Sequence, residues 1–264
     1  MYQKIEIPCF KCDLKSAILP KMVHIHTDFE SPRLTYTLDL VFKQLLGTGY
    51  ILNQKVPDGA AVICYSAKRL EDNALNIPCC SDLLNSSGFA PIQVIVSGNR
   101  EEMVLFPDLE FQDQGWKFDL FSAIFYLVSR YEEYSGFIPD QYGRFPYRES
   151  ILYKSGSIDY PLVNNWVKQL RNYLQKQWPA LIFREPSFRY ISTIDVDSTF
   201  RFKEKGALWS ISGGFRDLLK WKPGRVLNRI KTLWGLKPDD FDIFDEYEAF
   251  HKEYGIEVIY FFLL

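Results

Sequence analysis

Two apolar segments in the last third of the sequence constrain the fold most strongly. The first, Phe188 to Ile194, ends in Asp195, and the second, Ile256 to Leu264, is also strongly apolar. Between them, residues 226–234 and 242–254 have patterns typical of helices. A strand, a long connection with helices and a second strand form the start of a parallel α/β sheet or barrel, because parallel strands need a crossover. Two strands cannot close either arrangement.

The first 183 residues predict a separate mixed α/β domain, because strand-like and helix-like patterns alternate along them. Helical periodicity runs from Leu34 to Leu46, and Gly47 follows as a C-cap. A second helix is expected from Leu120 to about Tyr134, with Asp119 as its N-cap. The expected strands are Lys4–Ile7, Met22–His26, Ala60–Tyr65, Ile92–Val96 and Met103–Phe106.

A change of pattern after a third helix marks the expected domain boundary. This helix begins near Pro161, since proline is favoured in the first helical turn. The pairs Trp178-Pro179 and Glu185-Pro186 bracket a stretch that we interpret as a linker. The expected domains are therefore residues 1–183, a mixed α/β domain of unknown function, and residues 187–264, the start of a (β/α) unit. The apolar face of the third helix consists of Leu162, Trp166, Leu170 and Leu174.

The charge and hydropathy of the chain exclude several functional classes. Its 31 basic and 33 acidic residues leave a net charge of −2, which gives no indication of nucleic-acid or anionic-membrane binding. No stretch approaches the ~18 uninterrupted apolar residues of a membrane span. The first eight residues lack the apolar run of a signal peptide, so a cytoplasmic protein is expected.

The cysteines are compatible with a metal site but do not define one. Their odd number, five, argues against a disulfide framework. Cys9 and Cys12 have zinc-knuckle spacing, and Cys79 and Cys80 could complete four ligands. A zinc site would usually show a second C-x-x-C or a pair of histidines, so we favour reduced structural thiols.

The three histidines give no clear site either. His24 and His26 share one strand face and could bind a metal, but we favour the polar face of an edge strand. His251 lies in a charged helix and is expected to be solvated.

The chemistry is expected at the end of the strand that precedes Asp195. Asp195 and Asp197 are two residues apart, so on an extended backbone their carboxylates point the same way. Sites in parallel α/β folds are built at this end of the strands. Two crowded carboxylates invite a cation or divide into one acid and one base. A solvated strand end capped by the same residues is an equally good interpretation of the local sequence.

Three families use this local pattern. Thr193-Ile194-Asp195-Val196-Asp197 resembles the first motif of the polysaccharide deacetylases, the NodB-type or carbohydrate esterase family 4 domains, although Val196 departs from their adjacent acids. Asp195, Asp197 and Thr199 also fit the Asp-x-Asp-x-Thr string of haloacid-dehalogenase-type phosphatases. The bare Asp-x-Asp is shared with nucleotide-sugar glycosyltransferases, in which it holds Mn²⁺.

The rest of the chain favours the deacetylases. It resembles a bacterial family in which an uncharacterised N-terminal α/β domain precedes a deacetylase domain. The most specific strings are Ser129-Arg130-Tyr131-Glu132-Glu133-Tyr134 and the segment Thr193–Asp197. Weaker similarity covers Arg33–Asp39, Leu45–Gly47, Asp119–Ala123, Gly143–Phe145 and Pro161–Val163.

The resemblance implies a metal-dependent hydrolase of acetyl groups on a carbohydrate, built on a deacetylase-type (β/α) barrel and acting in cell-surface polysaccharide metabolism. It implies that Asp195 is the general base and that Asp197 is a ligand of a divalent metal, Zn²⁺ or Co²⁺, although Val196 allows these two roles to be exchanged. The family takes two further ligands from a His-[Ser/Thr]-x-x-His motif.

None of the three histidines lies in such a motif, so we expect the matching segment to follow Leu264 and this chain to be incomplete or inactive as it stands. The alternatives are a non-catalytic carbohydrate- or partner-binding protein and a phosphatase-like hydrolase. The strand 256–264 would be left with an unpaired edge, so self-association is also expected.

Overall fold

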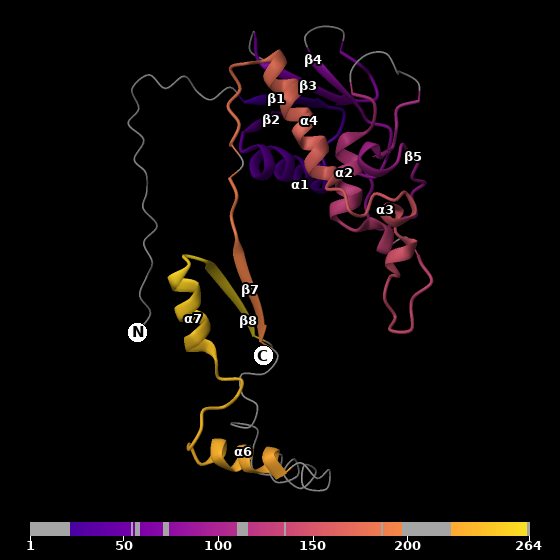
Figure 1. The fold of residues 1–264 in the computed structure, drawn as a ribbon. Coiled ribbons are helices and arrows are strands. Elements are labelled where there is room, and N and C mark those ends of the chain that lie inside the picture. The colour runs from indigo at the N-terminus through magenta and orange to yellow at the C-terminus, as the bar shows by residue number, and fades with distance from the viewer. Residues whose placement is uncertain are drawn as a thin grey trace, which may run out of the picture. The chain divides into compact units, whose positions relative to one another are not determined.

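The computed structural model describes residues 22–53, 55, 59–70, 74–109, 116–134, 136–185, 187–196 and 223–262. The strand expected at 4–7, the Cys9 and Cys12 pair and Asp197 lie outside these residues. The chain divides after Glu185 into two compact units, and each is described by itself (Figure 1). Both units combine helices with parallel strands, so the expected mixed α/β class is confirmed.

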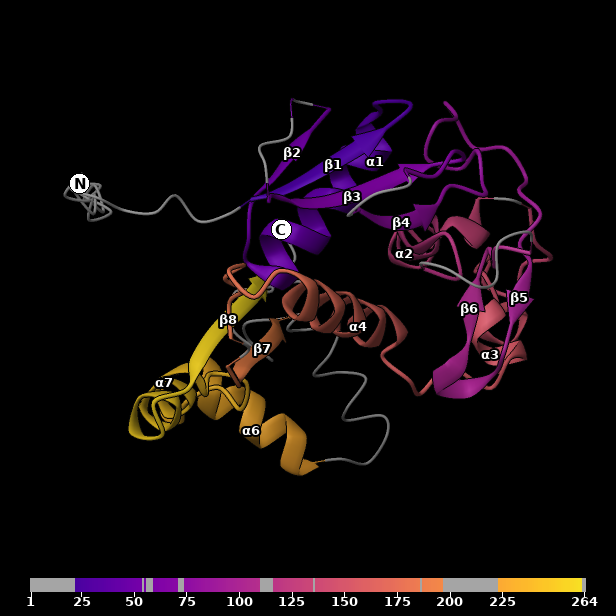
Figure 2. The ribbon, with the colours of Figure 1, turned by 90° about the horizontal axis from the view of Figure 1, so that it is seen from above.

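The first unit is built on a four-stranded parallel sheet in the order β2-β1-β3-β4 (Figure 2). The register places Ile25 beside Leu52 on one side and Ile63 on the other. β1 is therefore an inner strand, which corrects the edge position expected for His24 and His26. The strands are β1 (Val23–Thr27), β2 (Tyr50–Leu52), β3 (Ala61–Ser66) and β4 (Ala74–Pro78).

Three helical segments pack together with one face of this sheet in a single apolar core. Alternate strand residues point into it, including Val23, Ile63 and Leu75, each at most 1% exposed. The helical partners are α1 (Pro32–Leu38), which continues as the π-helix η1 (Asp39–Leu46), α2 (Leu120–Val128) and α4 (Leu162–Gln177). The expected apolar face of α4 is confirmed, since Leu162, Trp166, Leu170 and Leu174 are all buried.

Several expected elements are shorter than their patterns indicated, such as Met103–Phe106, of which only Val104–Leu105 forms a strand, β6. Within Ile92–Val96 only Val96 belongs to a strand, the two-residue β5, because this segment lies outside the central sheet and only borders the core. α2 ends at Val128 instead of near Tyr134, because Arg130 has a positive φ of 53° and stops the helix. The remaining short elements of this unit are β5 (Val96–Ser97), η2 (Arg100–Glu102), β6 (Val104–Leu105), η3 (Tyr131–Glu133), η4 (Tyr147–Glu149) and α3 (Ile151–Lys154).

The stretch interpreted as a linker is instead docked on the first unit. Leu181 and Phe183 are 2% and 7% exposed and belong to its core. The backbone N–H of Arg184 donates to the carbonyl oxygen of Leu46 at 2.9 Å. The bracketing prolines suggested a linker, but Leu181 and Phe183 between them pack into the core of the first unit.

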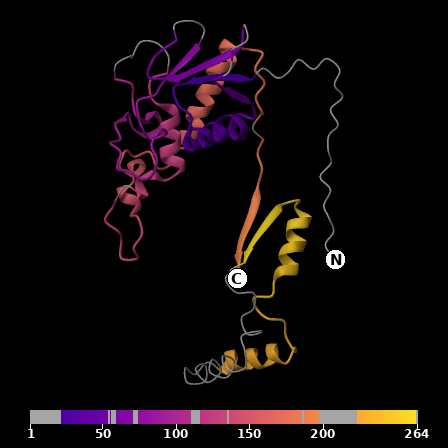
Figure 3. The same ribbon diagram turned by 180° about the vertical axis from the view of Figure 1, so that it is seen from behind.

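The described residues of the second unit include a parallel strand pair. β7 (Ile191–Val196) and β8 (Glu257–Phe262) lie in register with Asp195 beside Phe261. α6 (Pro223–Leu233) and α7 (Phe244–Glu253) belong to the connection, and α7 lies alongside β8 (Figure 3). The ring of Phe244 packs against those of Tyr260 and Phe262, with centroids 6.0 and 6.3 Å apart.

His251 on α7 is buried, contrary to the solvated position expected for it. Its side chain is 6% exposed, and its Nδ1 lies 2.5 Å from the carbonyl oxygen of Tyr247, one helical turn earlier. The charged neighbours of His251 point elsewhere because helix residues next to each other face different directions. Among the described helices, none has both the length and the apolar character needed to cross a membrane.

Gly47 ends η1 at a position where no other residue fits well. Its φ is 64°, and a Cβ added there would meet the side chain of Arg184. We expect Gly47→Ala to lower the free energy of unfolding by about 1–3 kcal/mol, measured by urea denaturation. Gly156→Ala is the matched control, because Gly156 has a φ of 67° but open space around it. Equal losses in the two variants would contradict a role for the Arg184 contact.

Candidate functional site

The predicted catalytic residue, Asp195, is an exposed side chain near the carboxyl end of β7. Its strand neighbour on β8 is Phe261, an apolar side chain that is itself exposed. Asp197 lies outside the described residues, and its pairing with Asp195 stays a prediction.

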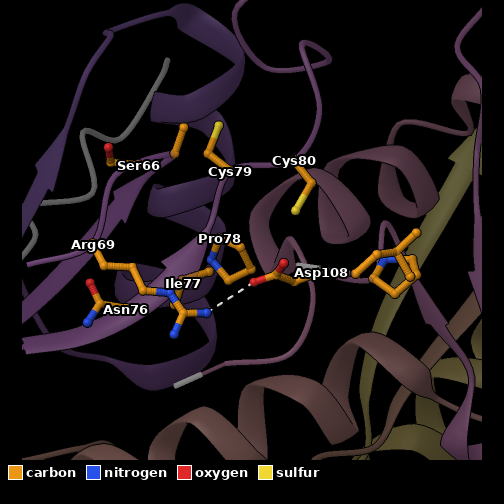
Figure 4. Close-up of a pocket in the computed structure, with 11 residues that line it drawn as sticks. Ser66, Arg69, Asn76, Ile77, Pro78, Cys79, Cys80 and Asp108 are labelled. Atoms are coloured by element: carbon orange, nitrogen blue, oxygen red, sulfur yellow. Dashed lines mark hydrogen bonds and ion pairs between the residues drawn. The ribbon is translucent and has the colours of Figure 1, made fainter. Parts of the chain in front are cut away.

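Among the described residues, no group of three or more His, Cys, Asp or Glu side chains is arranged to hold a metal ion. His24 is buried on β1, and its Nδ1 has no hydrogen-bond partner within this part of the chain. His26 is exposed and lies beside Cys64 of β3 in the register. The sulfur atoms of Cys79 and Cys80 point in different directions (Figure 4), as adjacent residues in an extended segment do.

The strand order of the first unit marks a second candidate site. β2 lies on one side of β1 and β3 on the other, so the connections diverge at the carboxyl ends of β1 and β3. Ligands of open parallel sheets bind in the crevice at such a point. Here Asp28, just after β1, accepts a hydrogen bond from the Ser66 hydroxyl at the end of β3. The same hydroxyl oxygen accepts a bond from the Lys68 N–H at 2.9 Å.

A pocket of about 300 Å³ opens beside this point, at the carboxyl ends of β3 and β4 (Figure 4). Among the described residues that line it, the charged ones are Arg69 and Asp108, whose Nη2 and Oδ2 atoms lie 3.2 Å apart. The Asp108 side chain is 6% exposed and that of Arg69 is 24% exposed, so the ion pair is largely buried. The lining residues are Ser66, Ala67, Arg69, Asn76, Ile77, Pro78, Cys79, Cys80, Pro107, Asp108 and Leu109.

Hydrogen bonds hold both walls of the pocket in place. The Asn76 side chain accepts from the N–H of Leu70 and donates to its carbonyl oxygen, both at 3.0 Å, which fixes the loop that carries Arg69. On the opposite wall the Asp108 N–H donates to the Lys117 carbonyl at 2.9 Å. The pocket is therefore preformed, by a side-chain contact to the backbone on one wall and a backbone contact on the other.

The end of the pocket near Cys80 rests on a buried carboxylate, Asp119. Its Oδ1 accepts bonds from the Tyr65 hydroxyl and the Ser122 N–H, at 2.9 and 3.0 Å. Its Oδ2 accepts bonds from the N–H groups of Cys80 and Ser81, at 3.0 and 3.2 Å. Asp119 is thus the expected N-cap of α2 and also a link between α2, β3 and the segment after β4.

Burial controls the ionisation of this cluster. It raises the pKa of Asp119 to about 6, although the hydrogen bonds from Ser122, Tyr65 and Cys80 favour the carboxylate. Burial, and then the negative charge of Asp119, raise the pKa of the Cys79 thiol to about 12. Cys79 therefore stays protonated at neutral pH and is not a nucleophile.

The sequence patterns missed the pair Arg69 and Asp108. Neither residue belongs to a recognisable motif, and 39 positions separate them in the chain. The one available signal was the position of Arg69 shortly after a predicted buried strand, where parallel sheets place their sites.

The first unit thus belongs to the α/β class, with a pocket at the carboxyl edge of a parallel sheet. A family model described as "Family of unknown function (DUF7033)" matches residues 23–179, which is more than half of the chain. The chain therefore belongs to this family. The search of curated proteins found no significant match, and neither did the search of solved structures.

The raised pKa of Asp119 predicts a pH dependence of stability. The folded state holds the proton up to about pH 6, whereas an unfolded aspartate releases it near pH 3.8. The stability that this group contributes is complete below the lower value and is lost as the pH rises through the higher one, by about 3 kcal/mol in total.

We expect Asp119→Asn to be less stable than the wild type at pH 4, because an amide nitrogen cannot accept a bond from the Cys80 and Ser81 N–H groups. The difference in unfolding free energy between the wild type and this variant should then become smaller towards pH 7. The wild type loses the contribution of Asp119 as the pH rises, whereas asparagine does not titrate. Urea denaturation at pH 4, 5, 6 and 7 measures this difference. A gap that is constant across this range would show that the pKa of Asp119 is not raised.

Proposed function

We propose that the chain is a deacetylase-like protein, in which the second unit begins a deacetylase-type (β/α) barrel that hydrolyses acetyl groups on a carbohydrate. The observation that supports this proposal is the exposed carboxylate of Asp195 near the carboxyl end of a parallel strand. That is where a barrel of this kind places its catalytic groups. The resemblance of the segment Thr193–Asp197 to the deacetylase motif supports it as well.

In this proposal Asp195 acts as a general base. Its carboxylate takes a proton from the water that attacks the acetyl carbonyl carbon, so the water arrives as a stronger nucleophile. Solvent exposure of Asp195 lets both water and a polymeric substrate approach. Phe261 on the neighbouring strand offers an apolar surface beside the reacting group.

The divalent metal of the proposal does not fit the described residues. The implied ligand set is Asp197 with two histidines, but Asp197 lies outside this part of the chain. His24 and His26 lie on β1 of the first unit, and His251 is buried against the backbone of α7. We therefore derive no step of the reaction through a metal.

Release of acetate and of phosphate by the full-length gene product separates the two hydrolase proposals. The substrates are acetylated glucosamine oligomers and p-nitrophenyl phosphate, assayed with added Zn²⁺ or Co²⁺. We expect acetate release, and we expect Asp195→Asn to lower kcat by about 10²–10⁴-fold, as loss of a general base does. Asp245→Asn is the matched control, because Asp245 is an exposed carboxylate on α7 of the same unit.

Phosphate release that depends on Asp195 would support the phosphatase alternative instead. Acetate release that is unchanged in Asp195→Asn would overturn the assigned role. Metal content, measured on the same samples, should fall in Asp197→Ala and stay constant in Asp245→Asn if Asp197 is a ligand.

We also propose self-association through the strand pair of the second unit. Among the described residues β7 and β8 pair only with each other, and Ile191, Ile259 and Phe261 are exposed on them. Dimers should form with rising concentration in analytical ultracentrifugation, and Ile259→Lys should shift the equilibrium to the monomer. Ile138→Lys, at an exposed site of the first unit, is the control. A monomer at every concentration would contradict this proposal.

A further inference from the structure

We propose that the pocket at the carboxyl ends of β3 and β4 binds a neutral sugar, with Arg69 and Asp108 as its hydrogen-bonding pair. This site lies in the first unit and is independent of the reaction proposed for Asp195. It would give the family-matched unit a binding role of its own.

The size and position of the pocket suit a small ligand. Its volume of about 300 Å³ is at the lower end of the range of small-molecule sites, ~300–1,000 Å³. It adjoins the carboxyl ends of β1 and β3, where the direction of the sheet connections changes. The Asn76 and Lys117 hydrogen bonds hold its walls before any ligand arrives, which reduces the entropy lost on binding.

The Arg69 and Asp108 pair matches the chemistry of hydroxyl groups. A carboxylate only accepts hydrogen bonds and a guanidinium only donates them, whereas a hydroxyl does both. Neighbouring hydroxyls of a sugar ring can therefore accept from Arg69 and donate to Asp108, whose charged atoms lie 3.2 Å apart. Bonds to charged partners are also stronger than those between neutral groups.

The charges around the pocket favour a neutral ligand over an anion. Arg69 and Asp108 cancel within the lining. Asp28 lies just behind Ser66, to which it is hydrogen-bonded, and Asp119 lies behind Cys80. Among the described residues, an anion in the pocket would contact the Asp108 carboxylate as well as Arg69, with Asp28 and Asp119 close behind the lining, and a cation would contact Arg69.

The pocket also offers apolar surface for the carbon atoms of a sugar ring. Pro78, Pro107 and Leu109 contribute hydrocarbon to its lining. A largely buried ion pair adds little to stability by itself, since desolvation offsets the attraction between its charges. Recognition of a ligand therefore explains the presence of this ion pair better than a contribution to stability does.

Protection of Cys80 from alkylation provides a direct test. Cys80 has an exposed thiol that lines the pocket, whereas the Cys79 thiol is mostly buried and its pKa is about 12. The whole chain is treated with iodoacetamide, and mass spectrometry follows the modification of Cys80. N-acetylglucosamine and methyl mannoside are the neutral probes, and glucuronate and inorganic phosphate are the anionic ones. We expect at least one neutral sugar to slow the alkylation of Cys80 several-fold in a saturable way.

Titration calorimetry with the protecting sugar then tests the pair itself. Arg69→Met and Asp108→Asn should each weaken binding by about tenfold or more, the usual effect of losing a hydrogen bond to a charged group. Arg171→Met is the matched control, since Arg171 forms a partly exposed ion pair with Glu185 away from the pocket. Circular dichroism establishes that each variant is folded.

Three outcomes would overturn the proposal. One is that no neutral sugar protects Cys80 or binds in the calorimeter. Another is that folded Arg69→Met and Asp108→Asn both bind as the wild type does. The third is that an anionic probe binds more tightly than every neutral one. Lack of acetate release would leave the proposal standing, because the readout is binding and not turnover.

Discussion

The carboxylate of Asp119 is the interaction on which the carboxyl edge of the first unit depends. It is fully buried and accepts hydrogen bonds from β3, from the start of α2 and from two successive N–H groups after β4. The Ser122 N–H is buried, and leaving a buried donor of this kind without a partner costs about 1–3 kcal/mol. A single side chain therefore fixes a helix, an inner strand and the segment that carries Cys80 relative to one another.

The shape of the pocket is set by these contacts and by those of the neighbouring loop. Cys80 at one end is held through its backbone by Asp119, and the loop bearing Arg69 is held by the Asn76 side chain. Asn76 itself lines the pocket, so one of the lining side chains also fixes the shape of the cavity.

Both units place polar groups at the carboxyl ends of parallel strands. In the first unit Ser66 and Asp28 meet where the sheet connections diverge, and in the second Asp195 stands near the end of β7. The common cause is geometric, because strand ends and the loops after them are free to carry chemistry while the strand centres fill the core. The match to a family of unknown function covers residues 23–179, so the proposals for the two units rest on separate grounds.

The sequence by itself determined the elements whose signals are local. The β1 and β3 strands, the Asp119 N-cap and the Gly47 C-cap follow from neighbouring residues. Only the tertiary structure decided what distant residues do to one another. It docked Leu181 and Phe183 on the core and joined Arg69 to Asp108 across 39 positions. The physical reason is that burial and ion pairing depend on which surfaces meet in space, and a local pattern does not contain that information.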